Sequence, residues 1–362
     1  MEKNVFRMKT VLLGKTPDEL KQIALDAGLP AFAGRQIAQW LYRKKVCSID
    51  EMTNLSKAGR ERLAERWTVG RTPWSDLQCS RDGTKKYLFP VACSHRTGLN
   101  VSDTDPDLEQ GAIEAVMIPD EDRRTLCVSS QAGCRMGCKF CMTGRQGFHG
   151  NLDAGDIINQ FLSVEESDQL TNTVFMGMGE PLDNYANVRR AIEILTADWG
   201  FGWSPKRITV STIGVLPNLK RYLDETRCHI AVSLHDPFGE ERGELMPVQR
   251  AYPLEEVIAL LRRYDFTGQR RVSFEYTMFS GLNDGKRHAD ALIRLLRGME
   301  CRVNLIRFHK IPDFPYETSH DGTMELFRDR LSRAGITATI RASRGEDIYA
   351  ACGMLAGAHE NQ

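Results

Sequence analysis

Three cysteines spaced C-x3-C-x2-C, Cys134, Cys138 and Cys141, constrain the fold of this chain more than any other feature. Thiolates at this spacing can hold three corners of a four-iron cluster and leave the fourth iron open, whereas most Fe–S clusters are held by four cysteines. A structural zinc site, or three unrelated core thiols, is the competing interpretation. The sequence offers no second C-x2-C pair or nearby His pair to complete a zinc site. The loop is therefore predicted to bind one [4Fe-4S] cluster.

The composition is that of an ordinary globular protein. The chain has 362 residues, enough for a large barrel and a smaller domain, with 41% hydrophobic and 27% charged residues. Neither an apolar run of membrane-spanning length nor the apolar core of a signal peptide is present, so we expect a cytoplasmic protein without a membrane partner. The ten cysteines are expected to remain reduced thiols in the cytoplasm, where disulfides are rare. The net charge is zero, so any nucleic-acid-binding surface must be a local patch.

Strand-like and helix-like segments alternate from about residue 125 onward. The strand-like runs, rich in β-branched residues, cover 125–129, 173–176, 208–212, 230–234, 272–278 and 303–308. The helix-like segments, with apolar residues three and four apart, cover 156–164, 188–196, 254–264, 288–296 and 324–334. This alternation predicts an α/β fold with a parallel sheet, built as a partial (β/α)6 barrel. The cysteine loop follows the first strand. In barrels of this kind the active-site residues lie at the carboxyl ends of the strands.

The amino-terminal part has a different pattern. Segments 18–27, 32–42 and 55–66 are predicted to be short helices, and 67–101 is β-rich with turns. Asp and Pro cluster at 100–107, which is typical of a boundary. We therefore predict a helical and β accessory domain over 1–104 and a core domain over 105–362.

Four further segments carry a resemblance to a known family. Residues 125–131 lead into the cysteine loop, in which Phe140 precedes the last cysteine. Gly177-Met178-Gly179-Glu180-Pro181-Leu182 and Ser233-Leu234-His235 each follow or end a predicted strand, and Arg344-Gly345-Glu346 precedes Ala351-Cys352-Gly353. Together these segments resemble the bacterial dual-specificity RNA (adenine-C2) methyltransferases of the radical S-adenosylmethionine (SAM) superfamily, over nearly the whole chain. The resemblance implies the partial barrel fold, one [4Fe-4S] cluster and two SAM molecules per turnover.

The resemblance also implies a SAM pocket. It is lined by residues at the strand ends, namely Gly179, Glu180, Ser211, Ser233, Leu234, His235 and His309. The family usually has Asn where this chain has His309, and His can still make one hydrogen bond there. Without the cysteine loop, Glu180 would be interpreted as a solvated residue in a tight turn.

The implied reaction uses two thiols, because C2 of adenine is not nucleophilic. One SAM methylates Cys352. The other yields a 5′-deoxyadenosyl radical that removes hydrogen from this methyl group, and the resulting carbon radical attacks the adenine. Cys127 then helps to remove the C2 proton, with Glu114 as an acceptor, and attacks the Cys352 sulfur to leave a transient disulfide. Without the resemblance, Cys127 and Cys352 would be interpreted as buried thiols and Glu114 as a surface residue.

The expected substrates are 23S rRNA and the adenine next to the anticodon in tRNAs. Local basic groups and the accessory domain are expected to contact RNA, and the target adenine must leave its stack. An electron donor such as flavodoxin or ferredoxin, a thiol reductant and a monomeric state are also expected. The alternatives are a C8-methylating enzyme, which typically has Ala where this chain has Pro181, and a radical SAM activase or sulfur-inserting enzyme. A non-catalytic Fe–S or zinc RNA-binding module is the third alternative.

Overall fold

The computed structural model describes residues 9–92, 110–268 and 270–356. The predicted domain boundary near 100–107 lies outside the described residues. By its contacts the chain divides into two compact units that are not continuous in sequence. The first unit comprises Met1–Pro73, Leu152–Ser167 and Ala186–Ser204, and the second comprises Trp74–Asn151, Asp168–Tyr185 and Pro205–Gln362. No helix among the described residues is long and apolar enough to cross a membrane.

The first unit is mainly helical. Its elements are β1 (Thr10–Val11), α1 (Pro17–Asp26), α2 (Ala33–Tyr42), α3 (Lys57–Arg66), β2 (Trp67–Thr68), α5 (Ala154–Ser163) and α6 (Tyr185–Thr196). Only the first residue of α6, Tyr185, belongs to the second unit. Thr16 and Glu19 form a capping box at the start of α1, with Pro17 in the first helical position. Phe161 of α5 lies edge-on to Trp203, with 5.9 Å between the ring centres. The three helices predicted for the amino-terminal part are confirmed to within about two residues at each end.

The second unit contains a sheet of ten strands in the order β14-β13-β12-β11-β10-β9-β6-β5-β4-β3. The strands from β14 to β6 pair in parallel, and β5, β4 and β3 continue the sheet in antiparallel pairs. The strands are β3 (Asp76–Cys79), β4 (Lys85–Ala92), β5 (Gln110–Asp120), β6 (Arg123–Cys127), β9 (Asn172–Phe175), β10 (Ile208–Thr212), β11 (His229–Ser233), β12 (Val272–Met278), β13 (Arg302–Arg307) and β14 (Thr337–Ile340). The six predicted parallel strands are confirmed, and the sequence analysis missed β14, a short edge strand.

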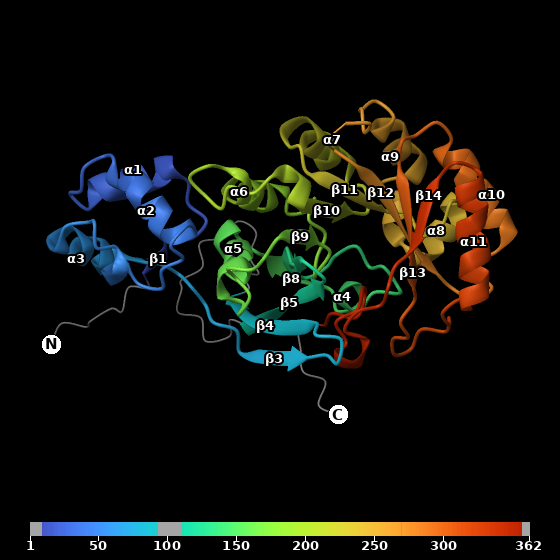
Figure 1. Ribbon diagram of the computed structural model, residues 1–362, viewed down its shortest axis with the longest axis horizontal. Helices are drawn as coiled ribbons and strands as arrows, with labels where there is room; N and C mark the ends of the chain where they lie inside the picture. Colours follow the sequence, from blue (N-terminus) through green and yellow to red (C-terminus); the bar gives the residue numbers. More distant parts are fainter. Residues whose placement is uncertain (1–8, 93–109, 269, 357–362) are drawn as a thin grey trace. The chain divides into compact units, whose positions relative to one another are not determined.

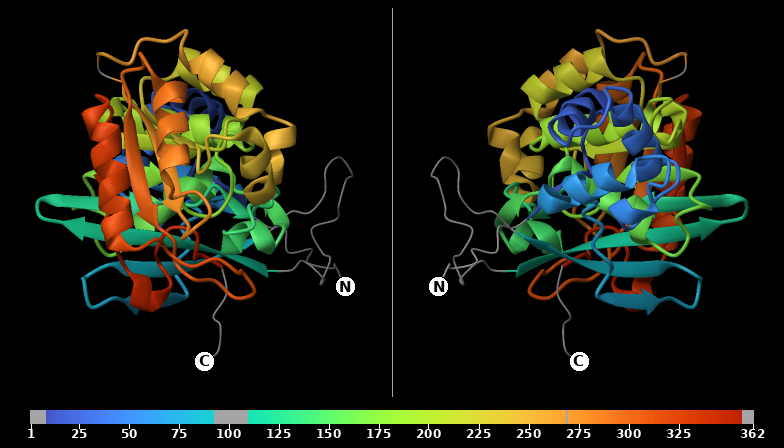
Figure 2. Two further views of the ribbon diagram at one scale, coloured as in Figure 1. Left: turned by 90° about the vertical axis from the view of Figure 1, so that its right-hand side faces the viewer. Right: turned by 90° about the vertical axis from the view of Figure 1, so that its left-hand side faces the viewer.

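Helices accompany the strands of this unit. They are α4 (Met142–Arg145), α7 (Leu216–Glu225), α8 (Gly239–Leu245), α9 (Leu254–Leu261), α10 (Lys286–Leu296) and α11 (Asp321–Arg333). Figures 1 and 2 show α10 and α11 side by side, with α11 beside β14. Neither α7 nor α8 was predicted from the sequence. The seven residues of α8 include two glycines and three glutamates, which hide any apolar periodicity.

The topology gathers the predicted site residues at one edge of the sheet. Cys127 is the last residue of β6, the glycine motif follows β9, and Ser211 lies near the end of β10. Ser233 ends β11, and His309 follows β13. Because parallel strands run in the same direction, their carboxyl ends meet at one edge, where ligands of α/β sheets bind. The fold alone therefore brings these segments together.

Candidate active site

The three motif cysteines lie in a short loop between β7 (Gln131–Gly133) and α4. Cys134 is buried, and Cys138 and Cys141 are half-buried. Burial raises the pKa of the Cys134 thiol to about 12, and the negative charges of Glu180 and Cys141 add to this increase. Burial and the charges of Cys141 and Cys134 also raise the pKa of Cys138. As thiolates these three groups would repel one another, and a bound metal cation would neutralise them, so the donor set fits a [4Fe-4S] cluster.

The loop is fixed to the sheet on its aromatic side. The ring of Phe140 lies 4.9 Å from the ring of His235 and 5.5 Å from that of Phe279, measured between centres. The Lys139 N–H donates a hydrogen bond to the Leu245 carbonyl, 3.0 Å away, at the end of α8. These contacts explain why an aromatic residue precedes the last cysteine.

The glycine motif lies against the segment that follows β6. The Met178 N–H donates to the Ser129 hydroxyl at 2.9 Å, and the Met178 carbonyl accepts from the Ser130 N–H at 2.8 Å. A Cβ atom on Gly177 would lie 2.7 Å from the Val128 carbonyl. A Cβ atom on Gly179 would lie 2.5 Å from the side chain of Gln131. Both glycines are therefore required by a close approach between two protein segments.

We expect Gly179→Ala to damage this loop. Its φ of +95° is unfavourable for any residue with a Cβ atom, and the added methyl group would also contact the Gln131 backbone nitrogen at 2.8 Å. Strain of this kind costs about 1–3 kcal/mol per residue. Urea unfolding should show that loss, and equilibrium dialysis should show weaker SAM binding. Gly298→Ala, which has a similar φ of +76° but no neighbour within 4 Å, is the matched control for strain alone. Equal SAM affinity in the two variants would contradict the role of the close approach.

Glu180 is buried and held by its neighbours. Its carboxylate accepts hydrogen bonds from the Thr212 hydroxyl at 2.6 Å and from the N–H groups of Ile213 and Leu182, each at 3.0 Å. Burial raises its pKa to about 7, although these hydrogen bonds act in the opposite direction. A carboxylate has about four acceptor positions. One position therefore remains for a ligand donor, and the carboxylate is fixed relative to β10.

His235 is neutral and oriented by β12 and the loop after it. Its Nδ1 accepts the Thr277 N–H at 3.0 Å, and its carbonyl accepts the Asn283 amide at 2.7 Å. Burial and the Arg242 charge lower its pKa to about 3, so Nε2 carries the single ring proton. His309 is buried with its Nδ1 3.4 Å from Glu346 Oε1.

The other predicted pocket residues lie on neighbouring strands. Ser211 on β10 faces Ala231 on β11, and Ser233 on β11 faces Glu275 on β12. Leu234 is fully buried, whereas Ser211 and Ser233 are half-buried.

Arg242 was not predicted from the sequence as a site residue. It is fully buried on α8, and its guanidinium donates to the carbonyls of Leu234 (3.0 Å), Ser233 (2.9 Å) and Ile213 (3.2 Å). It thus ties together the ends of β10 and β11. Its positive charge also opposes the increase in the pKa of Cys138, so it lies close to the cysteine loop. In the sequence it resembles a surface residue among glutamates, and no local signal distinguishes it.

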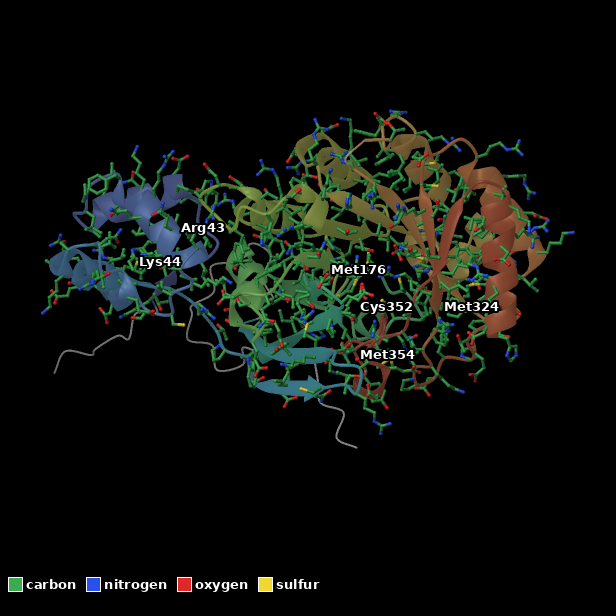
Figure 3. The ribbon with its side chains drawn as sticks, viewed as in Figure 1. Arg43, Lys44, Met176, Met324, Cys352 and Met354 are labelled. Carbon is green, nitrogen blue, oxygen red and sulfur yellow. The ribbon has the colours of Figure 1, made fainter. Side chains whose placement is uncertain are left out.

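Cys127 and Cys352 lie close enough to influence each other. Burial raises the pKa of Cys127 to about 12, the Cys352 charge adds to this increase, and a backbone hydrogen bond with Met176 opposes it. Both residues are free thiols, and Cys352 is exposed. Figure 3 marks Cys352 and Met354 on the last described segment of the chain, and Met176 after β9.

The segment that carries Cys352 is hydrogen-bonded to α4, the helix that begins after Cys141. The Met142 N–H donates to the Gly353 carbonyl at 2.8 Å, and the Thr143 hydroxyl donates to the Leu355 carbonyl at 2.7 Å. The Gln146 amide donates to the Ala356 carbonyl at 2.6 Å. These bonds hold Cys352 beside the loop that is predicted to bind the cluster.

Glu114 is buried, although an isolated Glu on an alternating strand is usually exposed. Its Oε2 accepts the Ala356 N–H at 2.8 Å, and its Oε1 lies 3.0 Å from Lys86 Nζ. Both side chains line a cavity of about 710 Å³, together with Met142, Phe314, Tyr349 and Met354. The wall of the cavity therefore carries one buried ion pair, together with Met354, which follows Cys352 by two residues in the chain.

Two family models match parts of this chain. The model of the radical SAM superfamily matches residues 128–293, which include the cysteine loop and the strand ends. The model described as the ribosomal RNA large subunit methyltransferase N-terminal domain matches residues 10–69, within the first unit.

Related proteins cover nearly the whole chain. A "Probable dual-specificity RNA methyltransferase RlmN" of Porphyromonas gingivalis is 57% identical over 96% of this chain and 94% of its own length. A "Dual-specificity RNA methyltransferase RlmN" of Syntrophus aciditrophicus is 40% identical over 94% of both chains. The crystal structure of a radical SAM methyltransferase from Sphaerobacter thermophilus superimposes with a TM-score of 0.86 at 38% identity, covering 96% of this chain and all of that one. The chain belongs to the RlmN family of dual-specificity RNA methyltransferases in the radical SAM superfamily.

Proposed function

We propose that this chain methylates C2 of an adenine in 23S rRNA and of the adenine next to the anticodon in tRNAs. One observation carries the proposal: the segment bearing Cys352 is bonded to the helix after Cys141 and lies near the thiol of Cys127. A methyl carrier, a second thiol and a three-cysteine loop are the parts that radical methylation of an unreactive ring carbon needs. C2 is favoured over C8 because Pro181 follows Glu180.

The residues have separate tasks in this proposal. Cys134, Cys138 and Cys141 would hold a [4Fe-4S] cluster, which when bound supplies the electron that cleaves SAM. Gly179, Glu180, Ser211, Ser233, Leu234, His235 and His309 line the SAM site. Cys352 carries the methyl group that becomes bonded to C2, and Glu114 accepts a proton. Cys127 attacks the Cys352 sulfur as the sulfur–carbon bond breaks, so that methylated RNA leaves and a disulfide remains for a thiol reductant.

We further propose that the accessory domain, residues 1–104, contacts the RNA. The part of this domain that belongs to the first unit carries three consecutive basic residues, Arg43, Lys44 and Lys45, and Figure 3 marks Arg43 and Lys44. The Lys44 ammonium lies 3.5 Å from the centre of the Trp40 ring, and Phe32 is 64% exposed. Basic groups attract phosphates, and aromatic faces can stack on unpaired bases. The proposed enzyme acts as a monomer in the cytoplasm, where its RNA substrates are, with flavodoxin or ferredoxin as the electron donor.

Labelling of Cys352 tests this proposal. Protein incubated with SAM carrying a labelled methyl group should acquire one label on the peptide that contains Cys352, because this thiol is exposed. Mass mapping of the RNA product should then place the same label at C2 of adenine. Cys79→Ala, another exposed cysteine, should leave the labelling unchanged. An unlabelled Cys352 peptide with labelled RNA would contradict the methyl-carrier role, and a label at C8 would favour the alternative reaction.

A further inference from the structure

Lys86 shares a face of the sheet with the proposed catalytic residues. On β4 it pairs with Val116 of β5, and Val116 pairs with Cys127 of β6. Directly opposed residues of antiparallel strands point to the same face, and so do residues two apart on one strand. Lys86, Glu114 and Cys127 therefore project from one face of three adjacent strands.

Lys86 is unusual in its burial. Its side chain is 11% exposed, and its Nζ lies 3.0 Å from Glu114 Oε1. Lysines are almost never buried unless they are paired. The ammonium group has three N–H donors, so the bond to Glu114 leaves donors for another group. Lys86 and Glu114 both line the cavity of about 710 Å³, with Tyr349 and Met354 on its wall.

The proposed substrate offers an acceptor for this ammonium group. C2 of adenine lies between N1 and N3, and each of these nitrogens has a lone pair that can accept a hydrogen bond. A cation bonded to either nitrogen withdraws electron density from C2, which favours attack by the carbon radical, and stabilises the electron density that shifts onto the ring as the bond forms. Such fixed donors act most strongly in a site that excludes water.

We propose that Lys86 is a further catalytic residue that donates a hydrogen bond to the ring nitrogen next to C2 of the target adenine. Its ion pair with Glu114 holds the carboxylate beside the same carbon. The inference rests on the proposed function, because it assumes that an adenine enters this cavity. Lys86 keeps its proton throughout, so it adds no covalent step to the reaction.

Atom-replaced RNA tests this hydrogen bond. Substrates carry adenosine, 1-deazaadenosine or 3-deazaadenosine at the target position, so that one ring nitrogen becomes C–H. Lys86→Met should slow methylation of ordinary RNA by about 10²–10³-fold, the cost of losing one positioned donor. The ratio of rates between ordinary RNA and one deaza RNA should be large in the wild type and much smaller in Lys86→Met. Such non-additivity shows that the two groups interact.

Further variants separate this role from a structural one. Lys86→Met leaves the Glu114 charge without its buried partner, so the double variant Lys86→Met, Glu114→Gln removes both charges. Labelling of Cys352 by SAM needs no RNA and should remain at the wild-type level in both variants. Lys85→Gln, on the same strand but the opposite face, should behave as the wild type. The inference would be overturned if the ratio of methylation rates between ordinary RNA and each deaza RNA were the same in the wild type and in Lys86→Met. A wild-type protein that methylates no adenine would instead contradict the proposed function.

Discussion

Cys127→Ala is expected to yield protein that is covalently bonded to RNA. In the proposed reaction Cys127 acts after the bond between the Cys352 methyl carbon and C2 has formed. Ala has no thiolate to attack the Cys352 sulfur, so the adduct cannot be resolved. Because Cys127 is buried at the end of β6, replacing it with Ala removes little volume and should leave the fold intact. The trapped species should survive denaturant, and nuclease should convert it to a Cys352 peptide that carries a nucleotide.

Two further variants serve as controls for this result. Cys127→Ala, Cys352→Ala should carry no RNA, since the carbon that forms the bond is absent. Cys228→Ala removes another buried thiol and should neither trap RNA nor lose turnover. Normal turnover by Cys127→Ala, without a trapped adduct, would assign Cys127 the role of an ordinary core thiol.

Replacing Cys134, Cys138 and Cys141 together with Ala should abolish iron binding. The anaerobically reconstituted wild type is expected to hold about four irons per chain, and the triple variant none. SAM cleavage by reduced protein should disappear with the iron. Methyl transfer to RNA should fall below detection, because in the proposed reaction the cluster supplies the electron that cleaves SAM.

Iron and sulfide analysis with electron paramagnetic resonance of the reduced protein measures this loss. Cys301→Ala, a half-buried cysteine outside the loop, is the control that should keep its iron. Stoichiometric zinc without iron in the wild type would favour the zinc interpretation of the loop.

The sequence predicted those parts of the site that depend on local spacing. The cysteine loop was recognisable from its spacing, whereas the glycine motif and the Ser-Leu-His segment were assigned to the SAM pocket through the family resemblance. The order of strands and helices was also predictable from the period of apolar residues. The edge strand β14, Thr337–Ile340, was not predicted; only one of its four residues is buried, so it lacks a run of apolar core positions.

The remaining features depend on pairs that are far apart in sequence. Glu180 is fixed by Thr212 and Ile213, and Lys86 meets Glu114 only because β4 and β5 pair in one register. Arg242 was missed for the same reason, since its acceptors lie at the ends of two strands. Single-sequence patterns contain no information about such partners. The structure therefore adds most to the sequence prediction by showing which charged residues of this site are buried.

The bonds between α4 and the last described segment have a consequence for biosynthesis. Met142, Thr143 and Gln146 are translated some 210 residues before the carbonyl groups that they contact, as the separation of Gln146 from Ala356 shows. A nascent chain can form the sheet and the cysteine loop while these donors still face water. The methyl-carrying thiol arrives only when synthesis is nearly finished. In the proposed reaction, a prematurely terminated chain that ends before Cys352 would lack the methyl carrier and could not become bonded to RNA.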